Sequence, residues 1–91
     1  MAEWRERVLN RLRAAIDAFE RGDAELPSLQ AELDAAAAVL ESPDADLIAT
    51  LRDAEADLES IRFMVASEDQ RKAATKRLLP LREQLRHTSG G

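Results

Sequence analysis

Residues 47–65, LIATLRDAEADLESIRFMV, hold the most regular pattern of the chain. Their apolar side chains recur at alternating steps of four and three residues. This spacing places them on one face of an α-helix, as in a central bundle helix or a short coiled-coil seam. We therefore predict a helix over about 43–66, with a stripe made of Leu47, Leu51, Ala54, Leu58, Ile61 and Val65.

Three further segments have the same helical periodicity. The first is predicted over about 3–22 and ends at Gly22, which suits the left-handed conformation that closes a helix. The second is predicted over about 27–41, with Pro27 in its first turn. The last covers about 68–86. Their apolar stripes are Trp4, Val8, Leu12, Ala15, Ile16 and Phe19, then Leu29, Leu33, Ala36, Ala37 and Leu40, then Ala74, Leu78, Leu81 and Leu85.

The connections between these segments carry helix-start signals. Ser42 is predicted to cap the third helix, and Ser67 with Gln70 matches a capping box for the fourth. Pro80 cannot donate a hydrogen bond to the carbonyl of Lys76, so we expect a kink or break there. The predicted fold is all-α: a small bundle of three long helices plus a fourth, Pro80-kinked C-terminal helix, in one domain over 1–87 with a flexible tail at 88–91.

Composition excludes several classes of protein. The 91 residues contain no cysteine, so disulfides, thiolate metal sites and a cysteine nucleophile are absent. The chain has no signal-like start and no apolar run of about 18 residues, so we expect a cytoplasmic protein without membrane contact. Its net charge of −5 argues against nucleic acid as a partner, because Lys and Arg contacts to phosphate supply most of that affinity.

Charge is distributed unevenly along the chain. Residues 1–22 sum to +1, residues 23–59 to −10 and residues 60–91 to +4. An acidic middle of this kind either complements the basic ends of its own chain or attracts a cationic partner. Eleven acidic residues stand against one Arg in the middle segment, so we expect part of this charge to stay unpaired.

No residue pattern indicates catalysis. The chain has no glycine-rich phosphate loop, no serine-centred elbow and no His-Glu metal motif, so we expect neither an enzyme nor a cofactor. Glu83 and His87 lie four residues apart, a spacing that suits a metal ion, but two ligands without a second pair indicate an exposed polar pair instead. No metal site is predicted.

Two large apolar residues lie beside the stripe of the third helix. Phe63 and Met64 form a second contact surface if the helix is covered on one side only, or belong to the core if helices cover it on two sides. Ile48 raises the same alternative. Trp4 is either an interface anchor or a cap on the open end of a thin core.

Five pieces follow one another along the chain: Ile-Asp-Ala-Phe-Glu-Arg-Gly at 16–22, Leu-Pro-Ser-Leu at 26–29, an Asp-rich start to the third helix, Asp-Leu-Glu-Ser-Ile-Arg-Phe at 57–63 and Leu-Pro-Leu at 79–81. In this order they resemble small, acidic, all-helical bacterial proteins, some of them similar to immunity or antitoxin partners of secreted polymorphic toxins. The likeness covers most of residues 12–85 and rests on the order of its pieces, from which no functional residue is carried over.

The sequence thus predicts a protein-binding module that uses an acidic surface to engage a basic protein partner, as an immunity or antitoxin protein would. The alternative is a structural or regulatory subunit that forms a homodimer through the third helix. In the first hypothesis carboxylates steer the partner and two apolar side chains anchor it. The residues assigned to this surface are Asp44, Asp46, Asp53, Asp57, Glu59, Phe63 and Met64.

Overall fold

The computed structural model describes residues 3–88 of the chain. Helices make up almost all of this range, which confirms the all-α prediction. In chain order they are α1 (Glu3–Arg21), α2 (Leu26–Val39), the 3₁₀ turn η1 (Ser42–Asp44), α3 (Ala45–Met64), α4 (Ser67–Arg77) and α5 (Leu79–Thr88).

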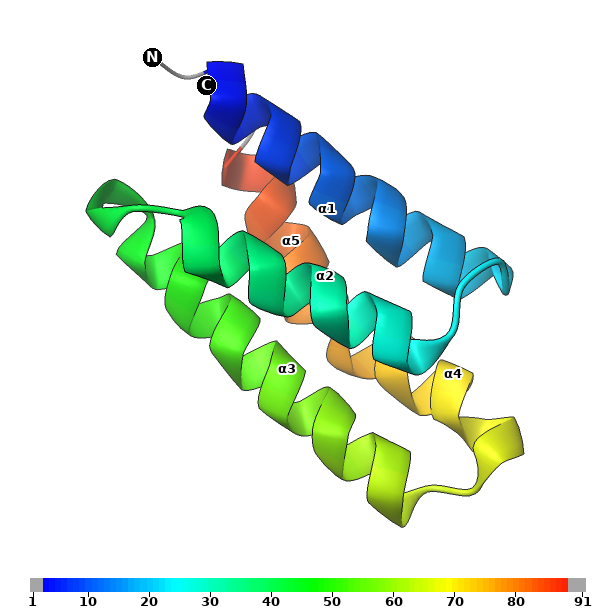
Figure 1. Cartoon of the computed structure of the whole chain (residues 1–91). Helices are drawn as coiled ribbons and strands as arrows, with labels where there is room; N and C mark the ends of the chain where they lie inside the picture. The colour runs from blue at the N-terminus through cyan, green and yellow to red at the C-terminus, as the bar shows by residue number, and fades with distance from the viewer. Residues whose placement is uncertain (1–2, 89–91) are drawn as a thin grey trace.

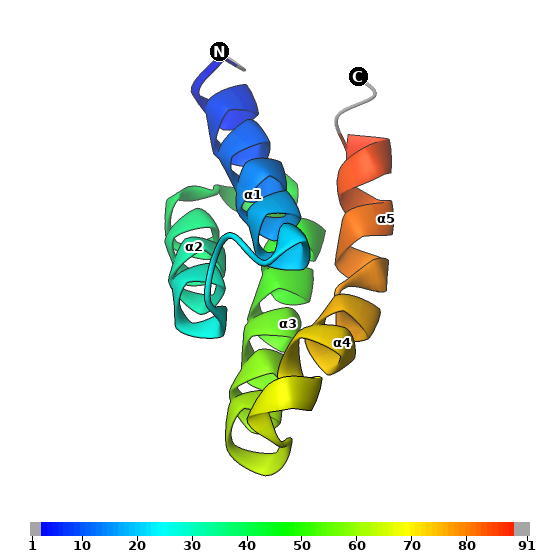
Figure 2. The same ribbon diagram turned by 90° about the vertical axis from the view of Figure 1, so that its right-hand side faces the viewer.

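The helices form a bundle in which α4 and α5 together take the place of a fourth helix. α3 packs against α2 on one side and against α4 and α5 on the other, whereas α1 contacts α2, α4 and α5 (Figures 1 and 2). The bundle measures 42 × 22 × 19 Å with a radius of gyration of 12.7 Å. This radius matches the roughly 13 Å of a compact chain of about this length.

Most members of the four predicted stripes lie in the core, whereas Trp4 is 40% exposed and Val8 and Ala15 are only partly buried. In α3, Leu51 and Leu58 have no exposed surface, and Leu47 is 2% exposed. Val65 at the end of the stripe is half-buried against the core. The other helices contribute the remaining buried apolar side chains: Leu9, Leu12, Ile16 and Phe19 from α1, Leu26, Leu29, Leu33, Ala36 and Ala37 from α2, and Ala74, Leu81 and Leu85 from α4 and α5, with Leu40 and Leu78 just after α2 and α4.

Two sets of contacts stabilise the C-terminal end of α1. Gly22 has a φ of +87°, and the amides of Gly22 and Asp23 donate to the carbonyls of Phe19 (3.1 Å) and Ala18 (2.8 Å). This is the Schellman pattern expected at a glycine terminator. From α4, Arg71 donates to the carbonyls of Phe19 (2.8 Å) and Ala24 (3.2 Å), and its guanidinium lies 5.2 Å from the Phe19 ring centre. α4 thereby holds the turn between α1 and α2.

Both predicted side-chain caps are wrong. Throughout the described range, no side-chain hydrogen bond caps η1, α3 or α4, and Ala66 rather than Ser67 precedes α4. Gln70 instead reaches backward, because its amide donates to the carbonyls of Arg62 (3.0 Å) and Val65 (2.9 Å) at the end of α3. It therefore closes the previous helix and does not start its own.

The C-terminal helix is bent, as Pro80 suggests. α4 ends at Arg77, Leu78 is a turn residue, and α5 continues at an angle of 39°. Pro80 lacks the amide hydrogen that would continue the helical ladder at this position. α5 extends to Thr88, so the predicted tail is wrong at that residue. Residues 89–91 of that tail lie outside the described residues.

The burial of the α3 stripe predicts a large loss of stability on truncation. Replacing Leu58 by Ala should lower the free energy of unfolding by about 2–5 kcal/mol, because a fully buried side chain leaves a cavity. Leu79→Ala is the matched control, since Leu79 is 58% exposed and should change stability by less than about 0.5 kcal/mol. Urea unfolding followed by circular dichroism measures both, and equal effects would contradict this packing.

Candidate functional site

The seven residues assigned to the acidic surface all lie on or next to α3, but they do not form one pocket. Asp44 directly precedes the helix and Met64 is its last residue. At a rise of about 1.5 Å per residue, the 18 steps from Asp46 to Met64 span about 27 Å. The candidate site is therefore a helix edge with an apolar end.

Asp44 forms an ion pair within the chain and is not available to a partner. Arg5 of α1 donates to both of its carboxylate oxygens, from Nε to Oδ2 at 2.8 Å and from Nη2 to Oδ1 at 2.7 Å. Its side chain is only 12% exposed. The hydrogen bonds from Arg5 lower the pKa of Asp44, and the same pairing raises the pKa of Arg5. Forked contacts of this kind join α1 to the start of α3.

Two more of the predicted steering residues are also engaged within the chain. Asp57 forms an ion pair with Arg77 of α4. Glu59 accepts a 2.7 Å hydrogen bond from the amide of Gln30, the buried polar residue of α2, and lies 4.0 Å from Arg62. These contacts tie α3 to its neighbours on both sides.

Asp46 and Asp53 keep the exposed position that the sequence predicts. Both are exposed, and neither has a basic group within 4.0 Å among residues 3–88. Asp53 lines a shallow pocket of about 230 Å³ between α3 and the bend of the last two helices, where Thr50 and Pro80 also lie. They are the carboxylates of the predicted site that remain available to a partner.

Most acidic residues of the middle segment form ion pairs within the chain. Of the eleven acids in residues 23–59, seven have a basic partner within 4.0 Å and four have none in the part of the chain that the structure describes. The paired residues are Asp23, Glu32, Asp34, Asp44, Glu55, Asp57 and Glu59, and the others are Glu25, Glu41, Asp46 and Asp53.

Phe63 and Met64 are strongly exposed, at 73% and 83%. Their burial inside the monomer, one of the two alternatives from the sequence, is wrong although α3 does pack on two sides. At about 100° per residue, Phe63 lies about 140° and Met64 about 120° around the helix from Leu58, in opposite directions. The guanidinium of Arg62 lies 5.6 Å from the Phe63 ring centre. Most of the Phe63 side chain is nevertheless exposed.

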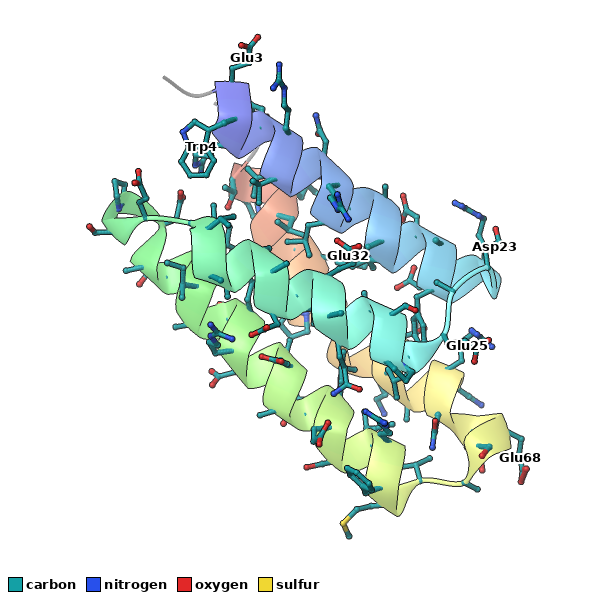
Figure 3. All side chains as sticks on the ribbon, viewed as in Figure 1. Glu3, Trp4, Asp23, Glu25, Glu32 and Glu68 are labelled. Atoms are coloured by element: carbon teal, nitrogen blue, oxygen red, sulfur yellow. The ribbon has the colours of Figure 1, made fainter. Side chains whose placement is uncertain are left out.

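Further carboxylates at this end of the molecule were not assigned to the site from the sequence. Glu68 and Asp69 follow Met64 closely, at the start of α4, and neither has a basic partner within 4.0 Å in residues 3–88. Figure 3 shows Glu25 and Glu68 pointing outward there. The nearness of Glu68 and Asp69 to Phe63 in sequence was the signal that could have indicated them. They were missed because both belong to residues 60–91, which carry a net positive charge.

Ile48 and Trp4 divide between the alternatives that the sequence left open. Ile48 is half-buried and packs against the core, so it belongs to the fold. Trp4, in the first turn of α1, keeps 40% of its surface exposed (Figure 3). It is neither sealed in the core nor as open as the pair at the end of α3.

The Glu83–His87 pair joins no larger cluster of ligands. The Nε2 atom of His87 lies 3.3 Å from a carboxylate oxygen of Glu83, and both side chains are mostly exposed. Within residues 3–88, no group of three or more His, Cys, Asp or Glu side chains is placed to hold a metal ion. The same residues include no helix that is both long and apolar enough to cross a bilayer.

Comparison with known proteins gives no assignment. No protein-family model matches the chain, and neither a curated protein nor a solved structure matches it.

The Arg5–Asp44 pair predicts a specific dependence of stability on pH. The pKa of Asp44 is lower in the folded chain than its ordinary value of 3.8, so the pair stabilises the fold above that pH and loses its effect as the pH falls through the lowered pKa. Asp44→Asn should therefore lower the free energy of unfolding by about 1 kcal/mol at neutral pH. Its difference from the unmodified chain should shrink below about pH 4.

Urea titrations at a series of pH values measure this difference. Asp53→Asn serves as the control, because Asp53 has no basic partner in the described chain and should shift stability by less than about 0.5 kcal/mol at any pH. An effect of Asp44→Asn that stays constant down to about pH 2 would show that the pair does not act through its charge.

Proposed function

We propose that the chain is a cytoplasmic protein-interaction module that binds a basic protein partner through the exposed pair Phe63 and Met64, with unpaired carboxylates along α3 and at the start of α4. The observation that carries this proposal is the exposure of two large, adjacent apolar side chains at the end of the helix that organises the core. The sequence resembles immunity and antitoxin proteins, so the form of this function that we propose is the masking of a toxin.

The apolar pair supplies the affinity in this proposal. Burying a side chain such as Phe or Met that water now surrounds contributes about 1.5–3 kcal/mol. An aromatic ring and a flexible thioether also adapt well to a partner pocket, and interfaces are enriched in both. Two adjacent anchors of this kind suit a binding site with a small energetic centre.

The carboxylates supply orientation and encounter rate. Asp46 and Asp53 lie along one edge of α3, and Glu68 and Asp69 lie at the start of α4, all without a basic partner among residues 3–88. The chain also has a net charge of −5. Complementary charge accelerates encounter and rejects wrong partners more than it adds affinity, so a basic partner surface fits this arrangement.

The rival hypothesis needs a different surface from the one that the sequence suggests. The regular stripe of α3 is buried inside the chain, with Leu51 and Leu58 fully covered, so it is not available for a coiled-coil contact between two copies. A homodimer would have to use another face. The exposed pair is one such face, and sedimentation separates the two hypotheses.

In sedimentation velocity, the purified chain should remain a monomer at micromolar concentration, because Phe63 and Met64 bind a different protein and not a second copy of the chain. The double variant Phe63→Ser with Met64→Ser should sediment in the same way. A dimer that dissociates in this double variant would favour the homodimer and assign the pair to self-association.

Affinity capture from the native cell tests the partner hypothesis. A basic protein should be retained by the unmodified chain and lost with the double variant Phe63→Ser and Met64→Ser. Leu79→Ser is the matched control, because Leu79 is also exposed but lies on α5, and it should retain the protein. Equal capture by all three chains would remove the apolar pair from the binding site.

Once the partner is purified, its association rate should fall strongly between about 50 and 500 mM salt, because charge steering is screened at high ionic strength. An association rate independent of salt would remove the electrostatic part of the proposal and leave the apolar part.

A further inference from the structure

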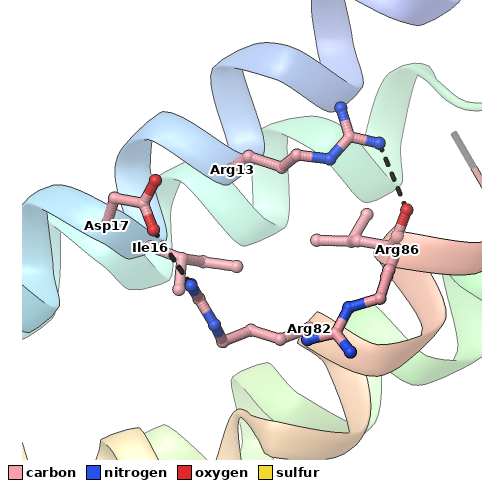
Figure 4. Close-up of a pocket in the computed structure, with 6 residues that line it drawn as sticks. Arg13, Ile16, Asp17, Arg82 and Arg86 are labelled. Atoms are coloured by element: carbon pink, nitrogen blue, oxygen red, sulfur yellow. Dashed lines mark hydrogen bonds and ion pairs between the residues drawn. The ribbon is translucent and has the colours of Figure 1, made fainter.

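A second surface feature lies on the other side of the bundle, between α1 and α5. Here a pocket of about 280 Å³ is bordered by three arginines from two helices (Figure 4). Its volume is near the lower end of small-ligand pockets, which run from about 300 Å³ upward. The pocket is lined by Arg13, Ile16, Asp17, Arg82, Leu85 and Arg86.

Two of these arginines are held in place by the fold. Arg13 donates from Nη2 to the carbonyl of Leu85 at 3.2 Å and from Nη1 to Asn10 at 2.8 Å. Arg82 donates from both Nη atoms to one oxygen of Asp17 at 3.1 Å. Each guanidinium is thereby fixed at the wall of the pocket, and positioned arginines lose less entropy on binding a ligand.

The third arginine has most of its donors available. Arg86 lies 3.5 Å from a carboxylate oxygen of Glu83, its side chain is 74% exposed, and it makes no hydrogen bond within residues 3–88. The Nε–H group of Arg82 is likewise without an acceptor in that range. Several N–H groups at the pocket are therefore still open to an acceptor.

Three positive charges border this pocket. Arg82 and Arg86 are four residues apart on α5, a spacing at which like charges destabilise a helix. Arg13 adds a third positive charge from α1, whereas Asp17 is the one carboxylate in the lining. Two further carboxylates stand next to these arginines, because Glu20 lies 3.5 Å from Arg82 and Glu83 lies 3.5 Å from Arg86.

We propose that this pocket binds the phosphate group of a small phosphorylated molecule. Guanidinium forks match phosphate oxygens in geometry, and three arginines at the border of one pocket suit a group with several acceptor oxygens. The lining has no aromatic side chain on which a base could stack, so a single-stranded nucleic acid does not fit this pocket. The pocket lies between α1 and α5, and its lining shares no residue with the protein-binding surface on α3 and at the start of α4.

Titration with inorganic phosphate tests this proposal, with the arginine Nε–H signals followed by NMR at constant ionic strength. The signals of Arg13, Arg82 and Arg86 should shift together and saturate, with half-saturation below about 10 mM. Sodium chloride at equal ionic strength should not reproduce the shifts. An equal response to chloride, or shifts that do not saturate, would overturn the proposal.

Three variants locate the effect. Arg86→Gln should weaken phosphate binding about tenfold, because it removes a charge-assisted contact. Arg7→Gln is the matched control, since Arg7 is 77% exposed and also stands beside a carboxylate, Glu3, and it should leave binding unchanged. Glu83→Gln should tighten binding, because it releases Arg86 from its carboxylate neighbour.

Equal weakening by Arg86→Gln and Arg7→Gln would show general charge attraction and would contradict a site. Binding of a single-stranded oligonucleotide without binding of inorganic phosphate would also contradict it. None of these outcomes depends on Phe63 or Met64, so the phosphate site and the protein-binding surface succeed or fail separately.

Discussion

The burial of one leucine stripe constrains the whole molecule. Leu51 and Leu58 of α3 are fully enclosed between α2 on one side and α4 and α5 on the other. A helix with one continuous stripe in the core has one rotational position, and that position decides which residues meet water. Phe63 and Met64 lie on the same helix about 140° and 120° around from Leu58, so the rotation that buries Leu58 leaves both of them exposed. The candidate binding surface is therefore a consequence of core packing.

Charge acts mostly inside the chain. Arg5 with Asp44, Arg11 with Glu32 and Arg77 with Asp57 each join two different helices or their ends, so the acidic middle is bound to the basic ends. Pairs of this kind contribute little stability one by one, but they favour one arrangement of the helices over others. Apart from these pairs, charged side chains gather in a few places on the surface. They are a few carboxylates along α3 and at the start of α4, and a cluster of arginines between α1 and α5.

The helices and their buried stripes were predictable from sequence because apolar periodicity is a local property, as the Leu47–Ile61 pattern and the end of α1 at Gly22 show. Interactions between helices were not. The partner of Asp44 is 39 residues away in sequence, and the exposure of Phe63 depends on which neighbours cover α3. The predicted cap at Ser67 failed for a related reason, because Gln70 found acceptors at the end of the preceding helix.

The most direct test is the solvent exposure of Met64 in the isolated chain. Methyl-labelled methionine gives two signals, from Met1 and Met64, and Met64→Leu assigns them. A soluble nitroxide should broaden the Met64 methyl strongly while leaving the methyls of Leu51 and Leu58 sharp. A Met64 signal as well protected as those of the two leucines would show that α3 is rotated or covered in another way, and the proposed surface would not exist.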